Sequence, residues 1–208
     1  MQTGDGLRGM GRIPPTPGWR MRWQCHDFHE LIVVMQGRFF VRSTEEEEPI
    51  DARGGDVLVY PAGCRHEERS DDRDPVELIF FSFLGPMSGS VRAVRDSEGR
   101  MRTLARWLLQ TRSVSYAEPS TTQWAYFTAL MEEFRRSERG SVASTAMVDN
   151  VRAFMRSNLS VGLSLEDLAA VAASSKYHFV RSYRRACGVT PMADLRSLRL
   201  AEAENLLR

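Results

Sequence analysis

Metal-binding residue types occur in two spaced groups within the first third of the chain. The first group is Gln24-x-His26-x-x-x-Glu30, and the second is Pro61-x-Gly63-x-x-His66. Two imidazoles and one carboxylate suit Zn, Fe, Ni or Mn, and they can leave open positions for a further ligand. Side chains alternate along a strand, so Gln24 and His26 are expected to share one face. A polar pocket or a hydrogen-bonded core cluster is the alternative.

A second group is basic and lies near the C-terminal end. Lys176, Arg181, Arg184 and Arg185 fall within one predicted helix, 176–187. Cations at such spacing suit phosphate groups, although a solvated helix face is the alternative reading. The formal net charge of the chain is +1, which argues neither for nor against nucleic acid.

Short strands are predicted to position the first group. From Trp19 to Phe83 the chain alternates β-branched and aromatic runs, such as 31–35 and 76–83, with turns rich in Gly, Pro and Asp. Strands at this spacing are typical of a β-sandwich or barrel. The preceding segment, 1–18, is rich in Gly, Pro and Arg, and is predicted to be a flexible N-terminal arm.

Helical periodicity begins near residue 100. Met101, Leu104, Ala105 and Leu108 share one helical face, and Trp124, Phe127, Leu130, Met131 and Phe134 share another. These two helices in 99–137 are expected either to cover the β-domain or to form a dimer seam. The polar, small residues of 138–145 predict an interdomain linker.

Capped helices are predicted beyond the linker, in 146–208. Ser164 and Asp167 form a capping-box-like start, Ser175 precedes the next helix, and Gly188 supplies a left-handed stop. Thr190-Pro191 then starts a last helix with proline at its first position. A capped helix, a short turn and a second capped helix with a basic outer face predict a helix-turn-helix.

Particular residues in this segment make the prediction more specific. They are Leu165-x-x-Leu168-Ala169, Ser175-x-x-x-Phe179, Tyr183-Arg-Arg185, Gly188-Val-Thr-Pro191 and Leu198-Arg199-Leu200-x-x-Ala203. Over 148–208 they resemble the AraC/XylS family of transcription regulators. The resemblance implies that 176–187 is a recognition helix in the major groove of DNA. The DNA-binding residues that it implies are Ser175, Lys176, Tyr177, Val180, Arg181, Arg184 and Arg185.

These residues are expected to divide into two roles. Tyr177, Val180 and Arg181 match base-reading positions, and Arg181 can pair with a guanine edge. Lys176, Arg184 and Arg185 are better placed for phosphates, which set affinity and its salt dependence.

Some positions depart from the family pattern. Ala173 stands at the turn position that is commonly glycine, where a left-handed backbone costs on the order of 1 kcal/mol. Asp194 stands where an apolar or aromatic residue is usual. The family also has a second helix-turn-helix, which this sequence lacks, so we expect weak, salt-sensitive DNA binding from this chain.

The two groups of the β-segment look like the paired motifs of the cupin superfamily. The resemblance implies a small barrel in which Gln24, His26, Glu30 and His66 line an effector pocket, with His26, Glu30 and His66 as candidate metal ligands. Gln24 replaces the usual first histidine, and His29 is expected to face away. The candidate cofactor is a divalent Zn, Ni, Fe or Mn ion.

The predicted fold class is therefore α+β, with a cupin-like sensor barrel at 19–98 and two helices, followed by an incomplete all-α helix-turn-helix segment. The expected function is an effector-responsive, DNA-binding transcription regulator rather than an enzyme, acting as a homodimer. A metal-dependent cupin enzyme and a shortened antagonist that dimerises with a full-length relative are the alternatives. Three cysteines without a disulfide framework, no apolar membrane span and no secretory signal predict a cytoplasmic location.

Overall fold

The computed structural model describes residues 6–44, 48–112 and 119–207 of the chain. The chain divides into two compact units, Met1–Glu138 and Arg139–Arg208. The first unit combines strands and helices, and the described part of the second is helical. The mixed α+β class predicted from the sequence is confirmed.

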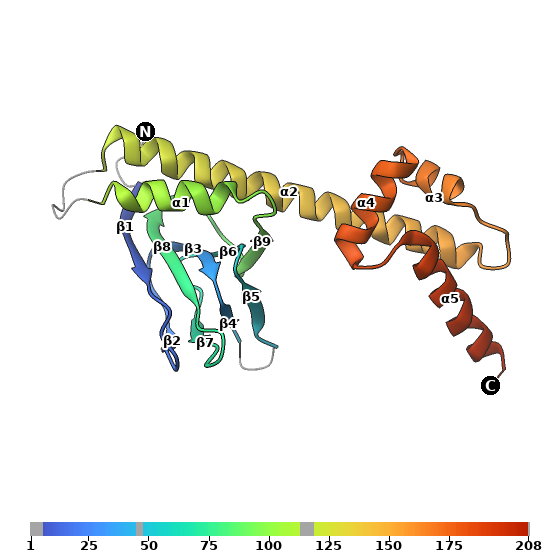
Figure 1. The fold of residues 1–208 in the computed structure, drawn as a ribbon, viewed down its shortest axis with the longest axis horizontal. Helices are drawn as coiled ribbons and strands as arrows, with labels where there is room; N and C mark the ends of the chain where they lie inside the picture. Colours follow the sequence, from blue (N-terminus) through green and yellow to red (C-terminus); the bar gives the residue numbers. More distant parts are fainter. Residues whose placement is uncertain (1–5, 45–47, 113–118, 208) are drawn as a thin grey trace. The chain divides into compact units, whose positions relative to one another are not determined.

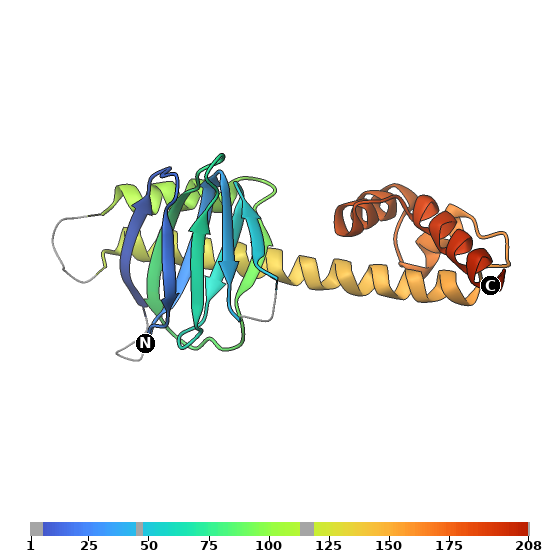
Figure 2. The ribbon, with the colours of Figure 1, turned by 90° about the horizontal axis from the view of Figure 1, so that it is seen from below.

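Two antiparallel sheets form the first unit (Figure 2). In spatial order, the five-stranded sheet contains β1 (Gly6–Ile13), β8 (Glu77–Leu84), β3 (His29–Gln36), β6 (Asp56–Tyr60) and β9 (Arg92–Arg95). The four-stranded sheet contains β2 (Arg20–Gln24), β7 (His66–Ser70), β4 (Arg38–Arg42) and β5 (Ile50–Arg53). The sheets are open, so the closed barrel stays a prediction.

The five-stranded sheet is buried on both faces, which explains its long apolar runs. On β3, Leu31 and Val33 pack against helices, whereas Ile32 and Val34 pack toward the four-stranded sheet. The helices are α1 (Arg100–Gln110) and the first part of α2 (Thr121–Ser157), which cover the outer face of this sheet (Figure 1). Because side chains alternate along a strand, a strand between two layers needs apolar residues at every position.

The four-stranded sheet is covered on one face only. Phe39, Val41 and Ala52 point inward and are buried, while the residues that alternate with them on β4 and β5 are half-buried or exposed. This alternation is typical of an antiparallel sheet with one solvated face.

The N-terminal arm predicted for 1–18 is wrong for Gly6–Ile13, which form β1. This strand pairs with β8 from Gly6 opposite Leu84 to Ile13 opposite Leu78, and Leu7 is buried. The Phe80 ring fills the space that a side chain at position 11 would occupy, because a Cβ on Gly11 would lie 2.4 Å from Phe80 Cζ. Glycine, which has no Cβ, therefore fits this position of the strand. Residues 1–5 of the predicted arm lie outside the described part.

The predicted apolar stripes of the covering helices face the sheet. Met101, Ala105 and Leu108 on α1, and Leu130 and Phe134 on α2, are buried in one cluster with β3 and β8. Trp107 is the large apolar residue of α1 that stays exposed, at 48%.

The linker predicted for 138–145 is helical within α2, and the boundary between the two units falls at its start, between Glu138 and Arg139. Serine, alanine and threonine do not end a helix in the absence of proline, and Gly140 costs only about 1 kcal/mol. The Thr145 hydroxyl donates to the Ser141 carbonyl, which satisfies it inside the helix (3.1 Å).

The end of α2 packs around one core with three further helices, which are α3 (Leu165–Val171), α4 (Lys176–Cys187) and α5 (Pro191–Leu206). Ser164 and Asp167 form a complete capping box, and Gly188 ends α4 with φ 80°. Thr190 caps α5 with Pro191 at its start. No described helix has the length and apolar character to cross a membrane.

Candidate functional site

The first predicted site lies between the two sheets. Gln24 at the end of β2 is directly opposite His66 at the start of β7, and Glu30 on β3 is opposite Tyr60 on β6. The loop after β2 supplies His26. The structure brings His26, Glu30 and His66 together, with one ligand atom of each within 4.8 Å of the others.

Backbone carbonyls orient both imidazoles. His26 Nδ1 lies 2.7 Å from the Phe28 carbonyl oxygen, and His66 Nδ1 lies 2.9 Å from the Cys64 carbonyl oxygen. A carbonyl can only accept, so each Nδ1 carries the proton and each Nε2 of the neutral ring keeps its lone pair. This is the tautomer that histidine uses to bind a metal through Nε2.

The Nε2 atoms face the centre of the cluster. His26 Nε2 is buried without a hydrogen-bond partner among the described residues, and it lies 3.4 Å from Glu30 Oε2. The Gln24 amide lies 3.2 Å from His66 Nε2, and a half-turn of the amide would present its oxygen instead.

Two buried carboxylates make the cluster acidic. Burial raises the pKa of Glu30, although the nearby His26 opposes that rise. Burial, with the charge of Glu30, raises the pKa of Glu68 to about 7. Burial lowers the pKa of His66, although its hydrogen bond to the Cys64 carbonyl opposes that fall. No lysine or arginine among the described residues lies within ion-pair distance of these two carboxylates, and His26 is the neighbour of Glu30.

The residues fit a divalent metal ion. Ligand atoms bound to one ion at about 2.1 Å are at most about 4.2 Å apart, so side-chain shifts below about 1 Å would close the site. A buried imidazole nitrogen without a partner and an adjacent carboxylate are the donors that such an ion prefers.

Sequence reasoning missed Tyr60 and Glu68, which extend the cluster. The Tyr60 hydroxyl and Glu68 Oε1 are buried without a hydrogen-bond partner in the described chain. Glu68 follows His66 by two residues on β7, so the alternation of strand side chains would have found it. His29 takes no part, as expected: it bonds to the Gly85 carbonyl and accepts from the Ala62 amide.

The second predicted site is the outer face of α4. Its apolar face buries Phe179 and Tyr183, which leaves Tyr177 83% exposed and Arg181 exposed. Val180 is half-buried, and Ser175 caps the helix without a side-chain hydrogen bond. Arg184 and Arg185 are exposed in the last turn, where the helix dipole favours cations.

The cations of α4 differ in their availability. Lys176 forms an ion pair with Glu166 of α3, so a phosphate would have to compete for it. In the described part of the chain, Arg181, Arg184 and Arg185 have no carboxylate within ion-pair distance. The turn before α4 contains Ala173 at φ 46°, so the left-handed backbone expected from the sequence is present.

A buried polar network holds the inner face of α4, and sequence reasoning missed it. Asp194 Oδ2 on α5 accepts from Arg152 Nε of α2 (2.7 Å) and from the Tyr183 hydroxyl of α4 (2.6 Å). Burial raises the pKa of Asp194, but these two hydrogen bonds outweigh it, so the pKa lies below its ordinary value. The one sequence signal for this network was Asp194, an acid at a position where an apolar or aromatic residue is usual.

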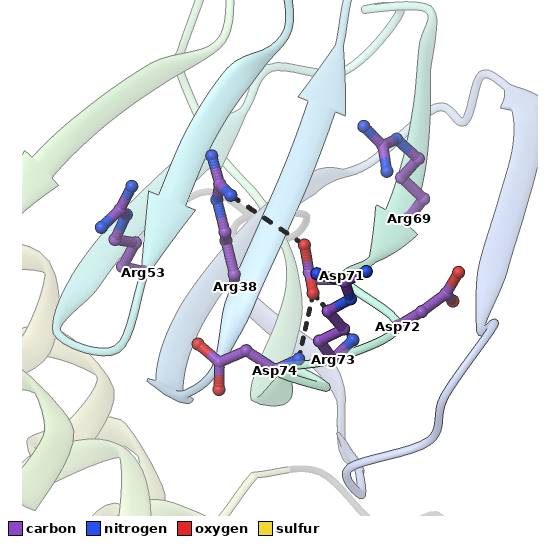
Figure 3. Close-up of a pocket in the computed structure, with 7 residues that line it drawn as sticks. All are labelled: Arg38, Arg53, Arg69, Asp71, Asp72, Arg73 and Asp74. Atoms are coloured by element: carbon purple, nitrogen blue, oxygen red, sulfur yellow. Dashed lines mark hydrogen bonds and ion pairs between the residues drawn. The ribbon is translucent and has the colours of Figure 1, made fainter.

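A third polar cluster lies on the outer face of the four-stranded sheet (Figure 3). Its residues are Arg38, Arg53, Arg69, Asp71, Asp72, Arg73 and Asp74. Arg38 donates two hydrogen bonds to Asp51, which also pairs with Arg53, and Asp71 accepts from the backbone of Arg73 and Asp74. Carboxylates thus pair with Arg38 and Arg53, whereas Arg69 and Arg73 have none within ion-pair distance among the described residues. Nothing in the cluster is buried without a partner.

Comparison with known proteins identifies a family match and several relatives. Residues 11–102 match the family described as the AraC-like ligand binding domain. The MmsAB operon regulatory protein of Pseudomonas aeruginosa (strain PAO1) is 29% identical over 207 residues, covering 90% of this chain and 65% of that protein. The HTH-type transcriptional activator RhaS of Enterobacter sp. (strain 638) is 26% identical over 203 residues, covering 88% and 72%.

One similar solved structure is a variant of apo ToxT from Vibrio cholerae. It is 7% identical, with a TM-score of 0.47, over 91% of this chain and 96% of that chain. The chain spans about two thirds of the length of its curated relatives, 65% of one and 72% of the other.

Proposed function

Because this chain is a relative of the AraC-type transcription regulators and carries their ligand-binding domain at residues 11–102, we propose that it is an effector-responsive, DNA-binding transcription regulator. The observation that carries the proposal is the division of α4 into two faces. Phe179 and Tyr183 bury the inner face, whereas Tyr177, Arg181 and Arg185 leave a polar, cationic outer face exposed. A helix of this kind, after a short turn, fits the major groove.

The residues of α4 would contact two parts of the DNA, the base edges and the phosphates. Arg181 would donate to guanine O6 and N7, Val180 would touch a thymine methyl, and Tyr177 would contact a neighbouring base edge. Arg184, Arg185 and Ser175 would contact phosphates, which fix the register of the helix. Lys176 would join them once it leaves Glu166.

The cluster between the sheets would receive the effector. His26, Glu30 and His66 would hold a divalent metal ion, with Gln24 beside them as a weaker neutral ligand. Such an ion would neutralise the buried carboxylates and offer open coordination positions to an oxygen-bearing effector. Phe28 stacks on His26 with ring centroids 4.0 Å apart, which fixes the imidazole and excludes water from one side.

The segments of the chain would act together to control DNA binding. The segment 19–98 would be the sensor, closed as a barrel around its ligand, and 99–137 would cover it and form a homodimer. The segment 146–208 would contact DNA in the cytoplasm. The effector would act by its different affinity for two arrangements of the protein, since a ligand without such a difference shifts no equilibrium.

Regulators among the relatives favour this function over a cupin enzyme. The test is selection of bound sequences from duplexes with a random 20-base-pair core, using the whole chain. Replacement Arg181→Ala is expected to lower affinity for the selected duplex by about 1–3 kcal/mol and to relax one base position. Arg184→Ala should weaken all duplexes alike and reduce the salt slope by about 1.

Arg106→Ala, an exposed arginine of α1, is the matched control and should change neither quantity. The proposal fails if the chain enriches no sequence, or if the three variants behave alike.

A further inference from the structure

The polar network in the second unit joins three helices at a single carboxylate oxygen. Asp194 Oδ2 receives the Arg152 guanidinium from α2 and the Tyr183 hydroxyl from α4 at 2.7 and 2.6 Å. Tyr183 is fully buried and Asp194 is 9% exposed. None of these three side chains belongs to the DNA-facing surface of α4.

Apolar packing alone would hold α4 loosely about its own axis. Phe179 and Tyr183 are the buried residues of α4, and apolar contact is not directional. A hydrogen bond of 2.6 Å is directional and weakens steeply when its angle changes. The bond from the Tyr183 hydroxyl therefore fixes the roll of α4 more sharply than the contacts of its ring.

A small roll has a large effect on base reading. At the surface of a helix, about 5–6 Å from its axis, a roll of about 20° moves atoms by about 2 Å. Hydrogen bonds to a base edge tolerate only a few tenths of an ångström. Val180 and Arg181 lie within one turn of Tyr183, so the anchor acts on the residues that would read bases.

A stabilising role alone does not account for the network. Replacing a buried ion pair by apolar residues of similar volume is often neutral or stabilising, so packing would serve stability equally well. A buried network that is fully paired can instead select one arrangement of the elements around it.

We propose that Tyr183, Asp194 and Arg152 are positioning residues that set the roll of α4 and thereby its discrimination between DNA sequences. The inference rests on the proposed function of α4 in DNA binding. Arg152 lies on the part of α2 that packs with α3, α4 and α5, so the reference point for the recognition helix lies within the second unit.

The variants for the test separate positioning from stability. Tyr183→Phe removes only the hydroxyl. The double replacement Arg152→Met with Asp194→Leu, made together with Tyr183→Phe, removes every polar group of the network, so that the site stays packed but apolar. Ser197→Ala is the control, because that hydroxyl on α5 bonds only to the Ala193 carbonyl within its own helix.

Each whole-chain variant is compared with the wild type on two probes: the duplex enriched by the wild type from a random 20-base-pair pool, and an unselected duplex. For Tyr183→Phe and the combined variant we expect discrimination between the probes to fall at least fivefold. Affinity for the unselected duplex should change less than twofold, and amide exchange in α4 without DNA should change less than threefold. Ser197→Ala should match the wild type.

The outcomes distinguish the two proposals. If the wild-type chain enriches no sequence, the proposed function fails, and the inference with it. If it enriches a sequence and both network variants keep full discrimination, the positioning role alone is overturned. If discrimination falls only together with faster amide exchange, the network is structural and the inference is also overturned.

Discussion

The two units of the chain each bury a tyrosine beside a carboxylate, with opposite outcomes. In the helical unit, Tyr183 and Asp194 meet Arg152, and the hydrogen bonds of the group are complete. Between the sheets, Tyr60 and Glu68 are neighbours, but the Tyr60 hydroxyl and Glu68 Oε1 make no hydrogen bond of normal geometry in the described chain, and the charge of Glu30 acts on Glu68. In the first cluster, side chains of the protein supply the hydrogen-bond partners, and in the second they do not.

The difference is one of charge. The cation Arg152 holds the pKa of Asp194 low, whereas burial and the charge of Glu30 raise the pKa of Glu68 to about 7. Buried polar groups are nearly always paired in native proteins, so those that are not require an explanation such as a bound ion or ligand. Under the two proposals, the completed cluster positions α4, and the incomplete cluster receives an ion or effector.

The largest expected effect is metal binding at the incomplete cluster. The chain stripped with EDTA should take up one equivalent of Zn²⁺ in a calorimetric titration. Replacement Glu30→Gln keeps the shape but removes the charged ligand, and should weaken binding on the order of 100-fold or more, as loss of a ligand exceeds the 10–100-fold typical of its outer partners. Zn²⁺ at about 100 times its dissociation constant should stabilise the wild type by about 2.7 kcal/mol.

Glu67→Gln is the matched control, because Glu67 lies on the outer face of the same strand as His66 and pairs with Arg42. It should leave Zn²⁺ binding unchanged. The contrast between the two clusters disappears if Glu30→Gln and Glu67→Gln bind Zn²⁺ equally, or if the wild type shows no saturable site.

The next effect concerns pH and Glu68. Its folded pKa of about 7 lies above its ordinary value of 4.5. The folded state therefore binds a proton that the unfolded state has lost, and stability falls as pH rises from 4.5 through 7. At about 1.4 kcal/mol for each pH unit, the full loss is roughly 3 kcal/mol.

Urea unfolding of metal-free protein at pH 5 and pH 8 measures this loss. All four tryptophans, Trp19, Trp23, Trp107 and Trp124, belong to the first unit, so their fluorescence reports on it. Glu68→Gln should abolish most of the difference between the two pH values. The low pKa of His66 acts in the other direction, and comparison with the variant removes its contribution. Parallel pH curves for wild type and variant would contradict the expectation.

For the cluster of Tyr183, Asp194 and Arg152 we expect a smaller loss in the free energy of unfolding, with a different pH dependence. Asp194→Ala leaves Arg152 and Tyr183 without their acceptor, and loss of one buried partner costs about 3–5 kcal/mol. Arg152 is 33% exposed, so solvent screening should reduce this to about 2–3 kcal/mol.

Because the pKa of Asp194 is lowered, its contribution is complete above its ordinary value of 3.8 and falls only below that. The loss in Asp194→Ala should therefore be the same at pH 6 and pH 8, measured by circular dichroism of helix unfolding. Asp149→Ala, at an exposed position of α2, should cost less than about 0.5 kcal/mol. A loss that grows between pH 6 and pH 8 would show that the cluster is not held as described.

Local patterns in the sequence were sufficient to predict the capped helices and the outer face of α4. The capping box of Ser164 and Asp167 and the stop at Gly188 depend on neighbouring residues, so they are visible in the sequence. The grouping of His26, Glu30 and His66 was accessible only through family resemblance, because it depends on strands far apart in the chain.

What the sequence could not give depends on tertiary partners. The strand at Gly6–Ile13 exists because β8 pairs with it and Phe80 fills the space above Gly11, neither of which its own composition shows. The helix through 138–145 is continued from both sides, which overrides weak local propensity. The acceptor role of Asp194 required Arg152, 42 residues earlier, at 2.7 Å.

The smallest expected effect lies in the turn between α3 and α4. Ala173 has φ 46°, a backbone that costs a residue with a Cβ about 1–2 kcal/mol, while glycine loses about 0.4–1 kcal/mol more conformational entropy on folding. Ala173→Gly should therefore raise the free energy of unfolding by about 0.5–1 kcal/mol. Ala172, its neighbour, has φ −79°, so Ala172→Gly should lower the same free energy by a similar amount. Equal destabilisation by both replacements would mean that the helical unit stores no strain at this turn. Opposite signs would show that the backbone strain lies at Ala173 and not at its neighbour.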